Sequence, residues 1–113
     1  APDADVECTF TNTIKNGSLK IIKDTVPDDD TIFDFTGDLG AFQLQDNNND
    51  QDGTLMMITF SNLLPGDFEV TETPHGNYNT TFACTDGQMN PTAITLAPDA
   101  RVEGTRVNTI KNG

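Results

Sequence analysis

The sequence TFSNLLPGDFEVTET, residues 59–73, decides the fold of this chain. Its centre, residues 64–67, reads LPGD and is a turn sequence, because proline fixes its own φ and glycine tolerates conformations that strain other residues. Apolar and β-branched residues alternate with polar ones on both sides of this turn. We therefore expect two strands here, at residues 55–60 and 68–73.

The same pattern extends outward from this segment over most of the chain. Apolar residues recur with a period of two, and Gly, Pro, Asn or Asp interrupt them at short intervals. No stretch has a convincing helical period. The 113 residues therefore predict one domain, a small antiparallel, Ig-like β-sandwich. Further strands are expected at residues 4–12, 18–23, 32–35, 41–44, 79–84, 92–96 and 102–109.

The chain begins and ends with two copies of one sequence. Residues 1–17 (APDADVECTFTNTIKNG) match residues 97–113 (APDARVEGTRVNTIKNG) at thirteen of seventeen positions. Such self-similarity is typical of repeat architectures. We therefore divide the chain into a linking strand, residues 1–17, and a β-sandwich repeat, residues 18–113. The repeats lie either along one long chain or on separate self-associating subunits.

The two copies differ where burial would matter most. By strand parity, positions 8, 10 and 12 share one face of the first copy. That face carries Cys and Phe, whereas its counterpart in the second copy carries Gly and Arg, and an arginine is costly to bury. The first copy is therefore the better core strand. Asp5, Cys8, Phe10 and Thr11 are replaced by Arg101, Gly104, Arg106 and Val107.

The strong negative charge excludes two classes of partner. The chain carries 18 acidic and 6 basic residues, a formal charge of −12. Phosphate backbones and anionic headgroups would repel it, so neither nucleic-acid binding nor action at a membrane surface is expected. No apolar run is long enough to insert into a membrane, and the first residues are not a signal peptide.

The two cysteines indicate an oxidising compartment. Cys8 and Cys84 are far apart in sequence and belong to no metal-type CxxC pair, so one disulfide is expected. Two possible N-glycosylation sequences, at Asn16 and Asn79, are compatible with an extracellular location. Each triplet is short enough to occur by chance.

Five segments together resemble a known family. They are GSLKIIKDT (17–25), FDFTGDLGAFQL (33–44), the opening segment, NYNTTFAC (77–84) and a last strand ending in VNT (107–109). They are similar to the Cna-B-like, or prealbumin-like, domains of bacterial and archaeal surface proteins, stalks and pilins. The resemblance implies a small β-sandwich with a structural or adhesive role.

In the fold that the resemblance implies, residues 4–12 are difficult to place as a strand of their own domain. In the family, the first and last strands lie side by side and parallel, and parallel neighbours need a long crossover. Only residues 13–17 separate strand 4–12 from the next strand. We therefore expect residues 4–12 to complete a neighbouring unit, with Cys8 bonded to Cys84 of that neighbour. The alternative is an ordinary hairpin with a disulfide inside the chain.

Many relatives in this family form a Lys–Asn amide bond beside a buried acid. By position, the resemblance implies Lys20, Glu72 and Asn108 here. Lys23, which faces the opposite way, is the alternative lysine, and Asn12 is the alternative asparagine. The plainer interpretation is an exposed lysine, an exposed glutamate and an asparagine at a strand end. A disulfide that already ties this region favours the plainer interpretation.

A polar loop resembles a calcium-binding sequence. Asn48, Asp50 and Asp52 alternate and are followed by a glycine, with Asp46 nearby, as in loops whose side chains converge on calcium. The first position is Asn rather than Asp, and the twelfth, Thr59, is not the expected glutamate. Calcium is therefore the only cofactor considered, against the plainer interpretation of a solvated acidic loop.

The sequence offers no enzyme chemistry. The one histidine, His75, lies in a turn sequence, and no Cys/His or Ser/His set, phosphate loop or zinc spacing accompanies it. We expect a non-enzymatic subunit or repeat of an extracellular prokaryotic fibre, pilus-like filament or stalk. It would associate with itself through residues 4–12. The alternative is an adhesin domain that holds a ligand in its loops.

Overall fold

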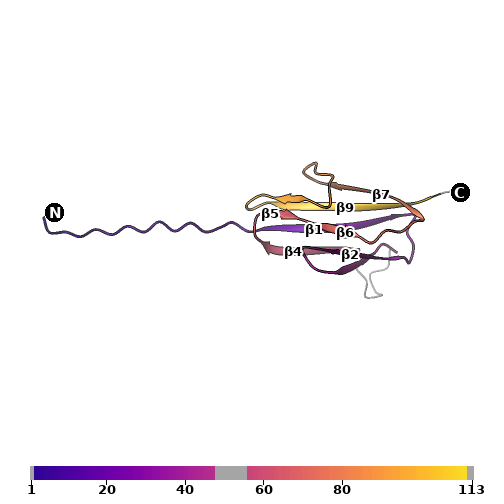
Figure 1. Cartoon of the computed structure of the whole chain (residues 1–113), viewed down its shortest axis with the longest axis horizontal. Coiled ribbons are helices and arrows are strands. Elements are labelled where there is room, and N and C mark those ends of the chain that lie inside the picture. The colour runs from indigo at the N-terminus through magenta and orange to yellow at the C-terminus, as the bar shows by residue number, and fades with distance from the viewer. Residues whose placement is uncertain (1, 48–55, 112–113) are drawn as a thin grey trace.

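The computed structural model describes residues 2–47 and 56–111 and contains nine strands in these ranges (Figure 1). Eight of the nine expected segments form strands and one of these is divided in two, whereas residues 4–12 form none, and no helix occurs among the described residues. None of the described segments is therefore a helix that could cross a membrane. The strands are β1 (Gly17–Val26), β2 (Ile32–Gly37), β3 (Phe42–Gln45), β4 (Met57–Leu63), β5 (Gly66–Phe68), β6 (Val70–Glu72), β7 (Tyr78–Cys84), β8 (Ile94–Leu96) and β9 (Arg101–Ile110).

The strands form two layers. One layer is a four-stranded sheet in the order β4-β1-β9-β7, and the other contains the sheets β3-β2-β6 and β5-β8. At the centre of the larger sheet, β1 and β9 run parallel, from Ser18 beside Arg101 to Val26 beside Thr109. All other pairs are antiparallel. The predicted all-β sandwich with parallel first and last strands is confirmed.

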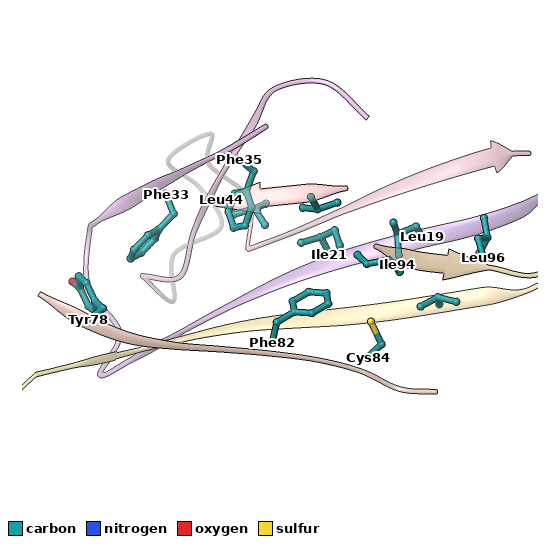
Figure 2. Close-up of a cluster of buried hydrophobic side chains, with 12 residues drawn as sticks. Leu19, Ile21, Phe33, Phe35, Leu44, Tyr78, Phe82, Cys84, Ile94 and Leu96 are labelled. Carbon is teal, nitrogen blue, oxygen red and sulfur yellow. The ribbon is translucent and has the colours of Figure 1, made fainter. Parts of the chain in front are cut away.

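The core lies between these layers and follows strand parity. On β1, the odd-numbered residues face inward, and Leu19 and Ile21 are completely buried. Aromatic and aliphatic side chains from both layers meet them, as Figure 2 shows. The buried apolar residues are Leu19, Ile21, Phe33, Phe35, Leu44, Val70, Tyr78, Phe82, Cys84, Ile94, Leu96 and Val102.

The predicted strand at residues 68–73 is two strands in two different sheets. β5 pairs with β8, β6 pairs with β2, and Glu69 lies at the crossing point. Asp38 holds this crossing: its backbone N–H donates to Glu69 O (3.0 Å), and its Oδ2 accepts from Glu69 N–H (2.7 Å). Alternation of residue type is the same in both strands, so the sequence pattern could not show this change of sheet.

Residues 2–16 form an arm that extends from the sandwich and is exposed throughout (Figure 1). It gives the molecule its longest dimension, 86 Å, against 29 and 20 Å for the other two. Asp99 N–H donates to Lys15 O (3.3 Å), at the base of the arm. Residues 4–12 belong to no strand, so the expected alternative of an ordinary hairpin within the chain is wrong.

Candidate cross-linking site

Lys23 occupies a core position on β1. It continues the inward series of Leu19 and Ile21, and its side chain is completely buried. The ammonium group lies 4.0 Å from the centre of the Phe33 ring, a distance that allows a cation–π interaction. Lys23 lies in the core because the odd-numbered residues of β1 face inward.

Glu72 and Asn108 meet Lys23 between the two layers. Glu72 projects from β6, and its Oε2 lies 3.3 Å from Lys23 Nζ. Asn108 projects from β9, and its Nδ2–H donates to Glu72 Oε1 (2.9 Å). All three side chains are buried, and one carboxylate contacts both the amine and the carboxamide in a site shielded from solvent.

Burial makes the Lys23 ammonium group easier to deprotonate. Desolvation lowers the pKa of Lys23 from 10.5 to about 8, although the Glu72 carboxylate works in the opposite direction. The nearby Arg106 guanidinium adds to the lowering. Arg106 also competes for the carboxylate, because its Nε lies 3.8 Å from Glu72 Oε1.

This arrangement has the components of an amide-forming reaction. An uncharged Lys23 amine is a nucleophile, and the Asn108 side-chain carbonyl oxygen has no hydrogen-bond partner among the described residues. Glu72 contacts both partners and is placed to carry a proton from the amine to the departing ammonia. These are the groups that an amide bond between β1 and β9 would use, and the bond itself stays a prediction.

The lysine named first from the sequence, Lys20, is the wrong one. Even-numbered residues of β1 face away from the core, and Lys20 is only partly buried, beside Thr59 and Glu103 on the neighbouring strands. Parity with Leu19 and Ile21 was the signal that selects Lys23. The structure brings Glu72 and Asn108 together with Lys23, whereas Asn12 lies in the arm.

The two cysteines lie in different environments. Cys8 is exposed in the arm, Cys84 is buried on β7, and both are free thiols. Desolvation, with a smaller contribution from Asp86, raises the pKa of the Cys84 thiol to about 11. Cys8 and Cys84 are not bonded to each other within the chain in this structure, and a bond between units stays a prediction.

Only part of the calcium sequence can be described. Asp46 is buried, and its Oδ2 accepts the Thr25 backbone N–H (2.8 Å). It lies beside Asp24 and Asp28, with carboxylate oxygens within 4.8 Å of one another. A hydrogen bond with Asp46 raises the pKa of Asp28. The other predicted ligands, Asn48, Asp50 and Asp52, lie outside the described residues. Calcium binding therefore stays a prediction.

The remaining predicted residues lie outside the Lys23 site. Asn16 is exposed at the base of the arm, and Asn79 is exposed on the edge strand β7, so glycosylation at either stays a prediction. His75 is half-buried, with its ring 4.7 Å from that of Phe33.

Two known structures with which the fold of this chain can be compared are pilins. The major pilin T-13 from Streptococcus pyogenes serotype GAS131465 superimposes with a TM-score of 0.59 at 18% identity, over 86% of this chain and 46% of that chain. This chain has a pilin-like β-sandwich fold. The major pilin T3.2 from serotype GAS13637 of the same species gives 0.48 at 17% identity, over 97% of this chain and 51% of that chain. This chain thus spans about half the length of either structure. No protein-family model and no curated protein sequence matches it.

Proposed function

We propose that this chain is a structural subunit or repeat of an extracellular, pilus-like fibre, and that the arm joins each unit to the next. The observation that carries this proposal is the arm itself. It repeats the sequence of β9, the strand at the centre of the larger sheet, yet residues 4–12 pair with no strand of their own sandwich. A strand sequence without a sheet requires a partner, and a second sandwich of the same kind supplies one.

The exposed apolar residues of the arm support this role. Val6 is 82% exposed, Phe10 92% and Ile14 62%, and strand parity would place the three on one face with Cys8 if the arm joined a sheet. Burying an apolar side chain of this size contributes about 1.5–3 kcal/mol, so an isolated arm forgoes several kcal/mol. An arm held in a neighbouring core recovers this free energy and resists pulling along the fibre.

The buried Lys23 site fits a load-bearing role. We propose that an amide bond between Lys23 and Asn108, assisted by Glu72, ties β1 to β9 in a unit whose own β9 is in place. These two strands begin and end the sandwich, so a covalent bond between them would stop the domain from opening under tension. The contacts of Glu72 with both partners support this reaction.

The fibre role is tested by negative-stain imaging of the purified chain and of a full-length variant with Val6→Ser and Phe10→Ser. We expect filaments from the unaltered chain and discrete particles from the variant, because the arm loses its apolar face. Met89→Ser is the matched control, since Met89 is also exposed (73%) but lies outside the arm. It should leave the filaments intact.

The alternative function makes the opposite prediction. Discrete monomers of the unaltered chain, at any concentration and ionic strength, would contradict the fibre proposal. They would favour the adhesin interpretation, in which the sandwich displays loops to a ligand.

A further inference from the structure

We propose that the arm enters the place of β9 in a second copy of the sandwich, in the register set by the repeat, so that Asn12 faces Lys23 and Cys8 faces Cys84 of that copy. This inference rests on the proposed fibre function and specifies its joint. Each joint would then carry an amide bond and a disulfide between units. The same contacts arise whether the second copy is a separate chain or an adjoining repeat.

The register follows from the sequence match. Because residues 1–17 repeat residues 97–113, each arm residue takes the place of the residue 96 positions later. The inward residues of β9 are Val102, Gly104, Arg106 and Asn108, and their arm equivalents are Val6, Cys8, Phe10 and Asn12. The β7 residues opposite them are known from the register of β7 and β9. The resulting pairs are Ile14 with Tyr78, Asn12 with Thr80, Phe10 with Phe82 and Cys8 with Cys84.

Cys8 would meet Cys84 in a geometry that suits a disulfide. Thr85 N–H donates to Glu103 O (2.8 Å), which makes Cys84 and Gly104 a pair that is not itself hydrogen-bonded, the type with the closer Cα atoms. A Cβ built at Gly104 lies 3.2 Å from Cys84 Sγ. In a disulfide, the corresponding distance is about 3 Å. Forming the bond releases two protons and two electrons, and a small-molecule disulfide accepts them and is reduced to two thiols.

The arm would change the packing around Phe82. Phe82 occupies the space left by the missing side chain of Gly104, since a Cβ there would lie 2.4 Å from the tip of its ring. Phe82 and Cys84 lie next to each other beside β9 in Figure 2. The Phe82 ring must therefore turn to admit Cys8, and Phe10 in place of Arg106 gives it an aromatic partner. The exchange also removes a cation that competes for Glu72.

Asn12 would then occupy the position of Asn108, which is completely buried and bonded to Glu72. A bond forms between Lys23 Nζ and Asn12 Cγ, the Cγ–Nδ2 bond breaks, and ammonia leaves with a proton carried by Glu72. Each lysine can form one such bond. Lys23 therefore locks whichever strand occupies this place, either its own β9 or the arm of a neighbour.

The test uses full-length Asn108→Ala, which removes the acceptor within the chain and keeps the arm. Two preparations, one labelled with ¹⁵N, are mixed under oxidising conditions, boiled with reducing agent and digested. We expect oligomers that survive reduction, and a peptide pair joined at Lys23 and Asn12 with mixed labels and the loss of one ammonia. Before reduction, a mixed-label Cys8–Cys84 pair should also appear.

A shifted register is the matched control. Thr11→Asn with Asn12→Thr, added to Asn108→Ala, moves the carboxamide to the outward face of the arm. It should abolish the reduction-resistant oligomers and keep the Cys8–Cys84 pair. Because Asn108→Ala could unfold the sandwich, the unaltered chain is also assembled from mixed labels, and its digest should contain the Cys8–Cys84 pair.

The outcomes separate this inference from the fibre proposal. Filaments whose digests contain neither joined pair, or amide bonds that persist in the shifted-register variant, would overturn the assigned register and leave the fibre role standing. A chain that forms neither filaments nor arm-dependent oligomers would overturn both.

Discussion

At the scale of single residues, the buried Lys23 is the most informative side chain. A buried charged amine is costly unless it is paired, and here one carboxylate serves both Lys23 and Asn108. Burial that lowers the stability of the ammonium form is also what produces a nucleophile. Burial of Lys23 therefore costs stability, and it also favours the neutral amine that an amide-forming reaction needs.

The amide-forming reaction should accelerate as the pH rises toward 8. Only the neutral amine of Lys23 reacts, and its pKa is about 8, so below that value the rate should fall about tenfold per pH unit. Above it, the rate should level off. The measurement is intact mass over time after cell-free synthesis at a series of pH values.

The variant Glu72→Gln is the test of the proton carrier, with Glu69→Gln as its matched control. Glu69 is three residues away but exposed. Glu72→Gln should retain the full mass at every pH, and Glu69→Gln should lose ammonia like the unaltered chain. Loss of ammonia at equal rates in both variants would contradict the role of Glu72.

The sequence predicted two of the three residues at this site and left the third open. Asn108 and Glu72 could be placed from the family resemblance, but Lys20 and Lys23 could be separated only by parity. Leu19 and Ile21 fix which face of β1 is buried, and Lys23 shares that face. The low solvent exposure of all three residues depends on contacts between distant strands, which a single sequence does not show.

At the scale of elements, the crossing between β5 and β6 is the most constrained connection. Gly37 lies opposite Val70 at the end of β2 and has φ +142°, a conformation that suits glycine. A Cβ there would overlap the backbone oxygen of Glu69, at 2.0 Å. The change of sheet therefore depends on a close approach of two backbones.

Gly37→Ala should lower the free energy of unfolding by about 3 kcal/mol, because the overlapping atom is backbone and cannot rotate away. Urea denaturation measures this change. Gly76→Ala is the control, since a Cβ at Gly76 meets nothing within 4 Å. It should change the free energy by no more than about 0.5 kcal/mol. Equal effects of the two substitutions would show that this crossing carries no special constraint.

The positions of strands were predictable where one face of the strand is buried and the other exposed, because apolar and polar residues then alternate. β1, β2, β7 and β9 alternate clearly and lie within a few residues of their expected positions. The pattern of residues 68–73 was also correct, but alternation carries no information about which sheet a strand joins. Residues 4–12 have a strand pattern that repeats that of β9, yet they join no sheet of their own chain, which the pattern alone could not predict.

At the scale of the whole molecule, the direction of the strands determines how units would stack. The arm leads into the start of β1, and the parallel β9 ends at the opposite end of the sandwich (Figure 1). An arm in the place of β9 runs parallel to β1 of the second copy. Successive units are then related by translation along one direction, which makes the fibre polar and head-to-tail.

The length of each step follows from the register. Ser18 lies beside Arg101, so in a joint the Ser18 of one unit lies beside the Asp5 of the next. Asp5 precedes Ser18 of its own chain by thirteen residues. At about 3.3 Å per extended residue, the axial rise should be about 43 Å per unit. Layer lines in the diffraction of imaged filaments measure this rise directly.

An insertion provides the control for this length. Two glycines placed between Lys15 and Asn16 lengthen the link without altering residues 5–14, and should increase the rise by up to about 7 Å while the joined peptides stay the same. An unchanged rise after insertion would mean that the bodies of the sandwiches, rather than the arm, set the spacing. A rise far from about 43 Å in the unaltered chain would place the arm in a register other than that of β9.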